Sequence, residues 1–210
     1  MAKVKEDLFI TFEGGEGSGK SSLIASLSTV LKEKKHPFLS TREPGGTPLS
    51  EEIRPLILHR EMSSYTELAL YLASRAEHVD KVLLPALKEG KIILCDRFND
   101  STVAYQGYAR KLDIKTVKSL CSFFSQNLNP KITFYLDIDP EIGLKRASRQ
   151  GLEELDRLEK EKLDFHQTIR KSFHQMAEQE KNRFCIIDGS LPKEKVLELA
   201  LDHLRQKNVI

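Results

Sequence analysis

The chain has 210 residues, of which 33 are basic and 31 acidic, so its formal net charge at neutral pH is +2. We expect one domain spanning residues 1–210, because this length suits a single core. A charge so close to zero argues against binding nucleic acid or a membrane surface through bulk charge, and we expect neither partner. No run approaches the roughly 18 apolar residues of a membrane span, and the N-terminus lacks the apolar stretch of a signal peptide. The three cysteines have no metal-ligand spacing, so we expect free thiols in a cytoplasmic protein.

Short apolar segments alternate with helical patterns along the chain. In chain order, strands are predicted at 8–12, 37–43, 91–96, 131–139 and 183–188, and helices at 20–35, 65–80, 152–181 and 192–206. Near-continuous apolar strands alternating with helices indicate a five-stranded parallel sheet covered on both faces. The predicted fold class is therefore α/β, with three α/β/α layers. Ligands of such sheets gather at the carboxyl ends of the strands.

The first strand runs directly into a glycine-rich turn, "EGGEGSGKSS". Gly14-x-x-x-x-Gly19-Lys20-Ser21 matches the phosphate-binding loop pattern completely. A polyphosphate wrapped by backbone N–H groups leaves no room for side chains, and the following helix offers its positive N-terminal end. Lys20 can reach the outer phosphates, and the Ser21 hydroxyl can bind Mg²⁺. The predicted nucleotide-binding residues are Gly14, Gly15, Glu16, Gly17, Ser18, Gly19, Lys20, Ser21 and Ser22.

The second strand and the second predicted helix add further candidates. The strand ends at Arg42 and Glu43, before a Pro-Gly-Gly turn. In the helix, Tyr71 and Arg75 are four residues apart, on a face that we expect to lie opposite the apolar stripe. A tyrosine ring beside a guanidinium can stack on a planar base, although such a pair is often a packing contact. We expect the nearby His78 to be a solvated neighbour without a role.

The third strand ends in "CDRFNDSTVAYQG". Asp96 can hold a metal through its water shell or fix a neighbouring arginine. The guanidinium of Arg97 offers a fork that matches a phosphate. The alternative, a surface ion pair, is less favoured because the residues follow an apolar strand into the same cleft as the phosphate loop.

Four basic side chains follow the fourth strand, within "LKRASRQGLEELDRLE". One interpretation is a solvated basic helix that contains Lys145, Arg146, Arg149 and Arg157. The alternative is a lid, at about residues 146–158, whose arginines close on the transferring phosphates.

Taken together, these motifs resemble the thymidylate kinase family, whose members phosphorylate dTMP with ATP. The resemblance covers essentially the whole chain, from "FEGGEGSGKSS" through "TREPGGTPLSEEIR", "SRAEH" and "DRFNDSTVAYQG" to "DRLE". It is similar to the bacterial type, in which the lid rather than the phosphate loop supplies an arginine. The family has a P-loop NTPase-type fold with a helical lid, uses ATP as phosphate donor with Mg²⁺, and forms homodimers.

The resemblance also implies roles for individual residues. Lys20, Arg97 and Arg149 would act in catalysis with Asp96 and Glu13, near a metal held by Ser21 and Asp96. Arg42 and Arg97 would hold the dTMP phosphate, and Glu43 would lie near the acceptor sugar. Arg75 would read a thymine carbonyl and Tyr71 would stack on the base, where many relatives have phenylalanine. The remaining implied contacts are Ser101, Thr102, Gln106 and Tyr105, the last of which would crowd C2′ and disfavour ribose.

Two alternatives to a dTMP kinase stay open from the residues themselves. The chain could phosphorylate another nucleotide or a deoxynucleoside, although a nucleoside kinase has no need of Arg42 and Arg97 for an acceptor phosphate. It could also be a regulatory nucleotide-binding protein. The sequence lacks the D-x-x-G and N-K-x-D motifs of regulatory GTPases.

Overall fold

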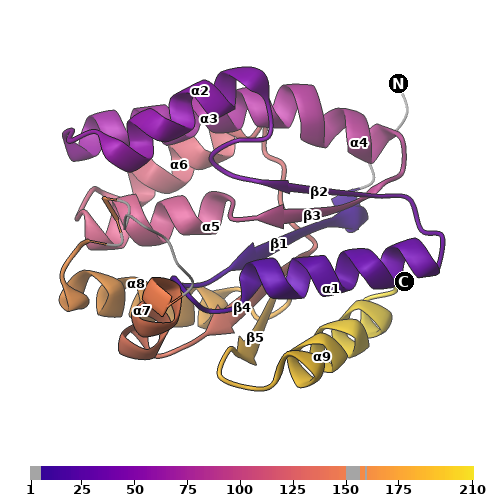
Figure 1. The fold of residues 1–210 in the computed structure, drawn as a ribbon. Coiled ribbons are helices and arrows are strands. Elements are labelled where there is room, and N and C mark those ends of the chain that lie inside the picture. The colour runs from indigo at the N-terminus through magenta and orange to yellow at the C-terminus, as the bar shows by residue number, and fades with distance from the viewer. Residues whose placement is uncertain (1–5, 150–156, 159) are drawn as a thin grey trace.

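A computed structural model describes residues 6–149, 157–158 and 160–210. Its centre is a five-stranded sheet in the order β2-β3-β1-β4-β5, with every paired strand parallel (Figure 1). The strands are β1 (Phe9–Glu13), β2 (Phe38–Arg42), β3 (Ile92–Asp96), β4 (Ile132–Asp137) and β5 (Phe184–Asp188). This confirms the predicted five-stranded parallel sheet.

Helices cover both faces of the sheet (Figure 1). They are α1 (Lys20–Glu33), α2 (Pro48–His59), α3 (Ser64–His78), α4 (Leu84–Lys88), α5 (Asn99–Thr102), α6 (Ile114–Phe124), α7 (Pro140–Arg149), α8 (Leu163–Gln179) and α9 (Lys193–Gln206). Two π-helical segments, Val79–Leu83 and Val103–Ala109, continue from α3 and α5, and a short 3₁₀ turn, Glu6–Leu8, precedes β1. No helix in these described residues is long and apolar enough to cross a membrane.

The core lies on both sides of β1 because its side chains alternate between the faces. Ile10 and Phe12 pack with the apolar faces of α1 and α9. Phe9 packs on the opposite face with Val79 and Leu83. The sheet is therefore the middle of three layers, as the apolar strand segments predicted.

Some predicted boundaries were wrong. The helix expected at 152–181 is α8, Leu163–Gln179, and Arg157, Leu158 and residues 160–162 are not helical. Leu158 is buried all the same, so it continued the apolar pattern without being part of the helix. The strand expected to reach 139 ends at Asp137. Pro192, expected in the first turn of the last helix, lies at its N-cap.

All five strands point their carboxyl ends to the same edge of the sheet. Asp96 of β3 is in register with Phe12 of β1 and with Arg42 of β2. The residues that follow β1, β2 and β3 are therefore brought together, although more than 80 positions separate the first from the last.

Candidate active site

The phosphate loop joins β1 to α1 and is shaped by glycines. Gly17 has φ +64°, and a Cβ there would lie 2.1 Å from the carbonyl oxygen of Gly143 in α7. Gly14 has φ +148°, and a Cβ there would lie 2.7 Å from the carbonyl oxygen of Leu136. At the start of α1, Gly19 makes no side-chain cap, so the first-turn N–H groups stay available to an anion.

Lys20 lies across this loop. Its Nζ donates to the carbonyl oxygens of Gly14, at 3.0 Å, and Gly15, at 3.2 Å. Burial lowers the pKa of Lys20, and the neighbouring Arg97 lowers it further, against the opposing carboxylates of Asp96 and Glu16. The ammonium is thus held at the loop by weak acceptors, which a phosphate oxygen can replace.

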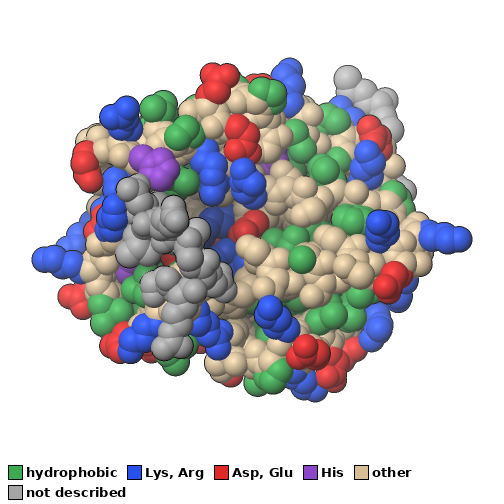
Figure 2. All heavy atoms as spheres, in the orientation of Figure 1, with side chains coloured by type: hydrophobic (Ala, Val, Ile, Leu, Met, Phe, Trp, Pro, Cys, Tyr) green, Lys and Arg blue, Asp and Glu red, His purple; other side chains and the backbone are tan. Residues whose placement is uncertain are grey.

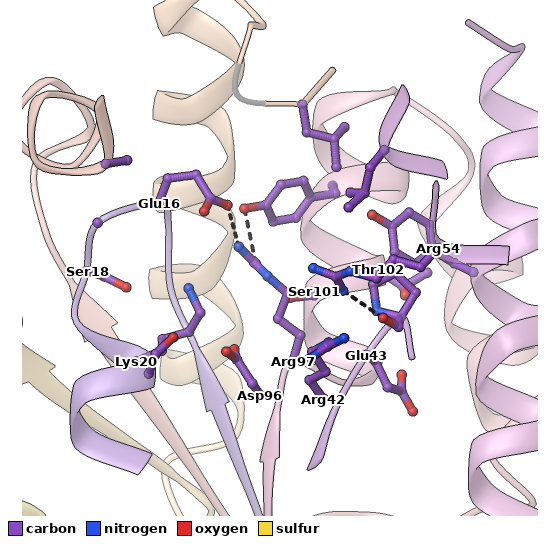
Figure 3. A pocket seen from close by; sticks show the side chains of 18 of the residues that line it. Glu16, Ser18, Lys20, Arg42, Glu43, Arg54, Asp96, Arg97, Ser101 and Thr102 are labelled. Carbon is purple, nitrogen blue, oxygen red and sulfur yellow. Dashed lines mark hydrogen bonds and ion pairs between the residues drawn. The ribbon is translucent and has the colours of Figure 1, made fainter. Parts of the chain in front are cut away.

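Arg97 lies at the centre of the site, directly after β3 (Figure 3). Its Nη2 is 2.5 Å from Oε1 of Glu16, and its Nη1 donates to the hydroxyls of Ser101 and Tyr105, both at 3.2 Å. Burial by itself would lower the pKa of Arg97, but Tyr105, Glu16 and Asp96 raise it well above its usual range. The guanidinium is therefore a fixed positive charge held next to the phosphate loop.

A second arginine, Arg75 of α3, is buried rather than exposed on an open helix face. Its Nε donates to Oε2 of Glu43 at 2.7 Å, and its Nη1 donates to Oγ1 of Thr102 at 2.9 Å. Burial would raise the pKa of Glu43, but Arg75 and His78 outweigh it and hold that pKa below its usual value. The expectation that Arg75 faces away from the buried stripe was wrong, because Arg75 follows Leu68 by seven residues and Leu72 by three, which places all three on one side of the helix.

His78 is also buried, so the expectation of a solvated neighbour was wrong. Its Nδ1 is 3.0 Å from Oε1 of Glu43, and its ring has no exposed surface. The sequence signal was its position three residues after Arg75, which places it beside Arg75 on the same helix.

Glu13 ends β1 but does not line the cavity. Its carboxylate accepts from the N–H of Phe98, at 2.8 Å, and from the hydroxyl of Ser101, at 2.5 Å. Burial, followed by the nearby Asp100 carboxylate, raises the pKa of Glu13 to about 8. In this position Glu13 fixes the start of α5.

The phosphate loop, Arg97, Arg75 and Glu43 line a cavity of about 400 Å³ at the carboxyl ends of the strands. Lys and Arg side chains gather around a hollow on the face drawn in Figure 2. The predicted residues on the cavity wall are Glu16 to Ser22, Arg42, Glu43, Tyr71, Arg75, Asp96, Arg97, Ser101, Thr102, Tyr105 and Gln106. Gly14, Gly15 and Glu13 do not line it.

The cavity also has lining residues that the sequence reasoning missed. Arg54 of α2 points toward the cavity and donates from Nη1 to the carbonyl oxygen of Pro44 at 2.7 Å (Figure 3). Burial and the neighbouring Arg42 lower the pKa of Arg54. Its place within "EEIRPLIL", soon after Arg42, was the available signal.

Asp96 and Ser21 lie on the cavity wall near the phosphate loop. Oδ1 of Asp96 is buried and has no hydrogen-bond partner among the described residues. No group of three or more His, Cys, Asp or Glu side chains in the described parts of the chain could hold a metal. A carboxylate and a hydroxyl nevertheless fit a cation that keeps several of its waters.

The predicted lid falls partly outside the described residues, including the side chain of Arg149 and all of 150–156. On its near side, Nη1 of Arg146 donates to the carbonyl oxygen of Gly189 at 2.7 Å. On its far side, Nη2 of Arg157 lies 2.6 Å from Oε2 of the buried Glu67 and also donates to the carbonyl oxygen of Ile57. Both arginines thus anchor the ends of the segment to the body of the protein.

Comparison with known proteins agrees with this geometry. Residues 12–200 match the model of the thymidylate kinase family. The chain belongs to the thymidylate kinase family. A thymidylate kinase of Protochlamydia amoebophila is 45% identical over 208 residues, covering 95% of this chain and 92% of the relative. One from Bacillus licheniformis is 47% identical over 194 residues, covering 91% and 92%.

Thymidylate kinases also share the fold. The crystal structure of the enzyme from Ehrlichia chaffeensis matches 94% of this chain and 97% of its own, with a TM-score of 0.76 and 31% identity. The family resemblance predicted from the sequence motifs is confirmed. Membership of a kinase family also sets aside the alternative of a regulatory nucleotide-binding protein.

A second cavity, of about 420 Å³, lies on the other side of the phosphate loop in this family member. It is lined by Gly17 to Gly19, Arg146 and residues 189–193, among others. Residues 189–193 follow directly after β5. The phosphate loop therefore forms a wall shared by two cavities.

Proposed function

We propose that the chain transfers the γ-phosphoryl group of ATP to dTMP, giving ADP and dTDP. The observation that carries this proposal is one cavity in which a phosphate loop faces Arg97, Arg42 and Arg54, with Arg75 and Tyr71 on its far wall. Membership of the thymidylate kinase family supports the same conclusion. The donor base would occupy the second cavity, so that the two nucleotides approach from opposite sides of the loop.

The transfer requires two anions to approach in line. An oxygen of the dTMP phosphate attacks the γ-phosphorus while the bond to the β,γ-bridging oxygen breaks, and the electron pair leaves with ADP. The attacking phosphate is already anionic, so no general base is needed and no phosphoenzyme forms. Catalysis comes from the alignment of the two phosphates and from the positive charges of Lys20, Arg97 and the lid residue Arg149, which offset the negative charge of the phosphates.

Arg97 must change partners during this reaction. In the structure Glu16 occupies the guanidinium that would hold the acceptor phosphate. A phosphate carries more negative charge than a carboxylate and can accept the same parallel hydrogen bonds from the planar guanidinium. We infer that dTMP displaces Glu16, which is then free to accept a hydrogen bond from the acceptor sugar.

Mg²⁺ would be held by Asp96, directly or through water, and by the Ser21 hydroxyl. The buried, unpartnered Oδ1 of Asp96 supports this assignment. Bound there, Mg²⁺ would neutralise charge on the phosphate oxygens of ATP. Asp96 and Ser21 would orient the donor with respect to Lys20.

The acceptor wall suits a deoxynucleotide base. Arg75 would donate to a thymine carbonyl while Tyr71 stacks on the ring, and Ser101, Thr102 and Gln106 would contact the base side. The ring of Tyr105 is buried and lies 5.1 Å from the Arg97 guanidinium, which fixes its position. We propose that it crowds a 2′-hydroxyl and so disfavours ribonucleotides.

We also propose that the single domain, 1–210, acts as a homodimer in the cytoplasm and that residues 146–158 close over the phosphates. Exposed apolar side chains on α2, α3 and α6, namely Leu49, Leu56, Tyr65 and Phe123, support self-association. Closure would exclude water and prevent wasteful hydrolysis of ATP. Light scattering after size-exclusion chromatography measures the assembly directly.

A panel assay tests the proposed function. The purified chain is incubated with ATP, Mg²⁺ and dTMP, dUMP, UMP or thymidine, and the products are separated by chromatography. We expect dTDP from dTMP, poor use of UMP relative to dUMP, and no product from thymidine. Faster turnover of another monophosphate would make the chain a kinase for that nucleotide, and equal rates on UMP and dUMP would contradict the role of Tyr105.

A further inference from the structure

His78 lies at the C-terminal end of α3, where the helix passes into the π-helical segment Val79–Leu83. Its side chain has no exposed surface. A buried imidazole needs partners for both ring nitrogens, because each nitrogen is a donor or an acceptor.

Both nitrogens have such partners. Nδ1 lies 3.0 Å from Oε1 of Glu43, and Nε2 lies 2.7 Å from Oγ1 of Thr41. A carboxylate oxygen accepts, so Nδ1 carries the hydrogen of the contact with Glu43. In that tautomer Nε2 has a lone pair for the Thr41 hydroxyl.

Through Glu43 the imidazole is connected to Arg75. Oε1 of Glu43 faces His78, and Oε2 accepts from Nε of Arg75 at 2.7 Å. The Arg75 guanidinium donates to Thr102 of α5 and lies over the ring of Phe98. A continuous line of contacts, Thr41–His78–Glu43–Arg75–Thr102, thus joins β2, α3 and α5.

His78 also fixes the turn that follows β2. Gly46 has φ +85°, and a Cβ there would lie 2.7 Å from Cδ2 and Nε2 of the His78 ring. The turn therefore rests directly on the imidazole. His78 does not line the 400 Å³ cavity, and of its neighbours Thr41, Glu43 and Gly46 it is Glu43 that lines it, together with Arg75.

We propose that His78 is a positioning residue for the acceptor nucleotide: its Nδ1–H orients Glu43, and Glu43 orients the Arg75 guanidinium on the cavity wall. The inference rests on the proposed function, in which this wall receives the base of dTMP. The inference predicts an effect on the binding of one of the two nucleotides. Loss of the Nδ1 contact should weaken the acceptor nucleotide and leave ATP, which binds on the other side of the phosphate loop, almost unaffected.

Two substitutions separate the two nitrogens. The amide of His78→Asn falls near the position of Nδ1 and can still donate to Glu43, whereas that of His78→Gln falls near Nε2 and cannot. Thr41→Val is the matched control, because it removes the partner of Nε2 and leaves Nδ1 in place. For each variant, KM for dTMP, KM for ATP and kcat are measured, and dTMP is titrated calorimetrically.

We expect His78→Gln to raise KM and Kd for dTMP about tenfold or more, with KM for ATP changed less than twofold. His78→Asn and Thr41→Val should stay within about threefold of the wild type for dTMP. Equal losses in both His78 variants, a parallel rise in KM for ATP, or unchanged values in His78→Gln would each overturn the inference. The proposed function fails separately, if the wild-type chain does not phosphorylate dTMP; the same titrations are then made with the monophosphate that it does use.

Discussion

Arg97 holds a backbone conformation that side chains rarely adopt. Its φ is +67°, which costs a non-glycine residue about 1–2 kcal/mol. The conformation is held by a hydrogen bond from its N–H to the carbonyl oxygen of Phe12, at 2.9 Å, and by the contacts of its side chain. This geometry aims the guanidinium of Arg97 at the phosphate loop instead of along the strand.

Replacing Arg97 by alanine tests its role in the transfer. We expect Arg97→Ala to bind ATP with nearly normal affinity but to lose turnover on dTMP by on the order of a hundredfold or more, because the charge that develops in the transition state is no longer compensated. Calorimetry with ATP and steady-state kinetics with dTMP measure the two effects. Arg42→Ala is the control: that side chain is half exposed and paired with Glu51, so its loss should mainly raise KM for dTMP. Near-normal turnover in Arg97→Ala would contradict the assignment.

At the scale of elements, the phosphate loop and α7 touch through backbone atoms. A Cβ on Gly143 would lie 2.3 Å from the carbonyl oxygen of Glu16, and one on Gly17 would lie 2.1 Å from that of Gly143. Glycine at these two positions lets α7 lie directly against the loop. The contact therefore leaves no room for a side chain at either position.

This contact reverses the usual effect of an alanine. In an ordinary helix interior, glycine to alanine stabilises by about 1 kcal/mol. We expect Gly143→Ala instead to lower the free energy of unfolding and to weaken ATP binding, since the loop must shift away from the added methyl group. Urea denaturation and ATP titration measure both. Gly15→Ala is the control for unfolding, because a Cβ there meets nothing within 4 Å; a more stable Gly143→Ala would refute the contact.

Helix α5 depends on a distant ion pair. Both Nη atoms of Arg183, which precedes β5, donate to Asp100, at 2.6 and 2.8 Å, and Nη1 also donates to Thr133. Asp100 is almost completely buried, so its charge needs this partner. The pair ties the segment that carries Ser101 and Thr102 to the start of β5, at the edge of the sheet.

Removal of the Arg183 charge should lower the free energy of unfolding more than removal of the Asp100 charge does. We expect Arg183→Gln to destabilise the fold by about 3 kcal/mol or more, because it leaves Asp100 charged and buried. Asp100→Asn should cost less, and the double variant should cost clearly less than the sum of the two. Chemical denaturation of all four proteins gives the coupling energy. Strict additivity would show that the two side chains do not stabilise each other.

At the scale of the whole molecule, several charged side chains are buried although the net charge is close to zero. Lys20, Glu13, Glu43, Glu67, Arg75 and Asp100 are all buried. Most of them are paired across elements, as Glu43 is with Arg75 and Asp100 with Arg183. Folding therefore depends on pH through the groups whose pKa differs between the folded and unfolded chain.

Glu13 gives the clearest pH dependence. Its pKa rises from an ordinary 4.5 to about 8 on folding, so between these values the folded chain keeps a proton that the unfolded chain releases. The free energy of unfolding should therefore fall as pH rises through this window, by at most about 1.4 kcal/mol per pH unit from this group. Glu13→Gln should flatten the fall, whereas Glu198→Gln, on the surface, should keep it. Urea denaturation at pH 5, 6.5 and 8 without nucleotide checks this, and identical slopes in all three proteins would contradict it.

Local pattern was enough where the physics is local. The apolar segments predicted five parallel strands, because a strand covered on both faces must be apolar throughout. The glycine spacing with Lys20 and Ser21 predicted the phosphate loop, because backbone wrapping of an anion requires those residue types in that order. Residues at the strand ends, such as Arg42 and Asp96, could be assigned to one cleft because parallel strands end at one edge.

Tertiary packing decided what local pattern leaves open. His78 is buried because its ring contacts Thr41 of β2 and Glu43, partners that helical periodicity in α3 alone does not indicate. Asp100 and Arg183 are paired although they lie 83 residues apart in the chain, and no sequence pattern indicates that they are close in space. Leu158 looked helical because its burial continues the apolar stripe of α8, although it lies in a turn. The sequence by itself thus determined the strands, the phosphate loop and the family, whereas the tertiary structure decided which charges are paired, because pairing depends on which elements the fold brings into contact.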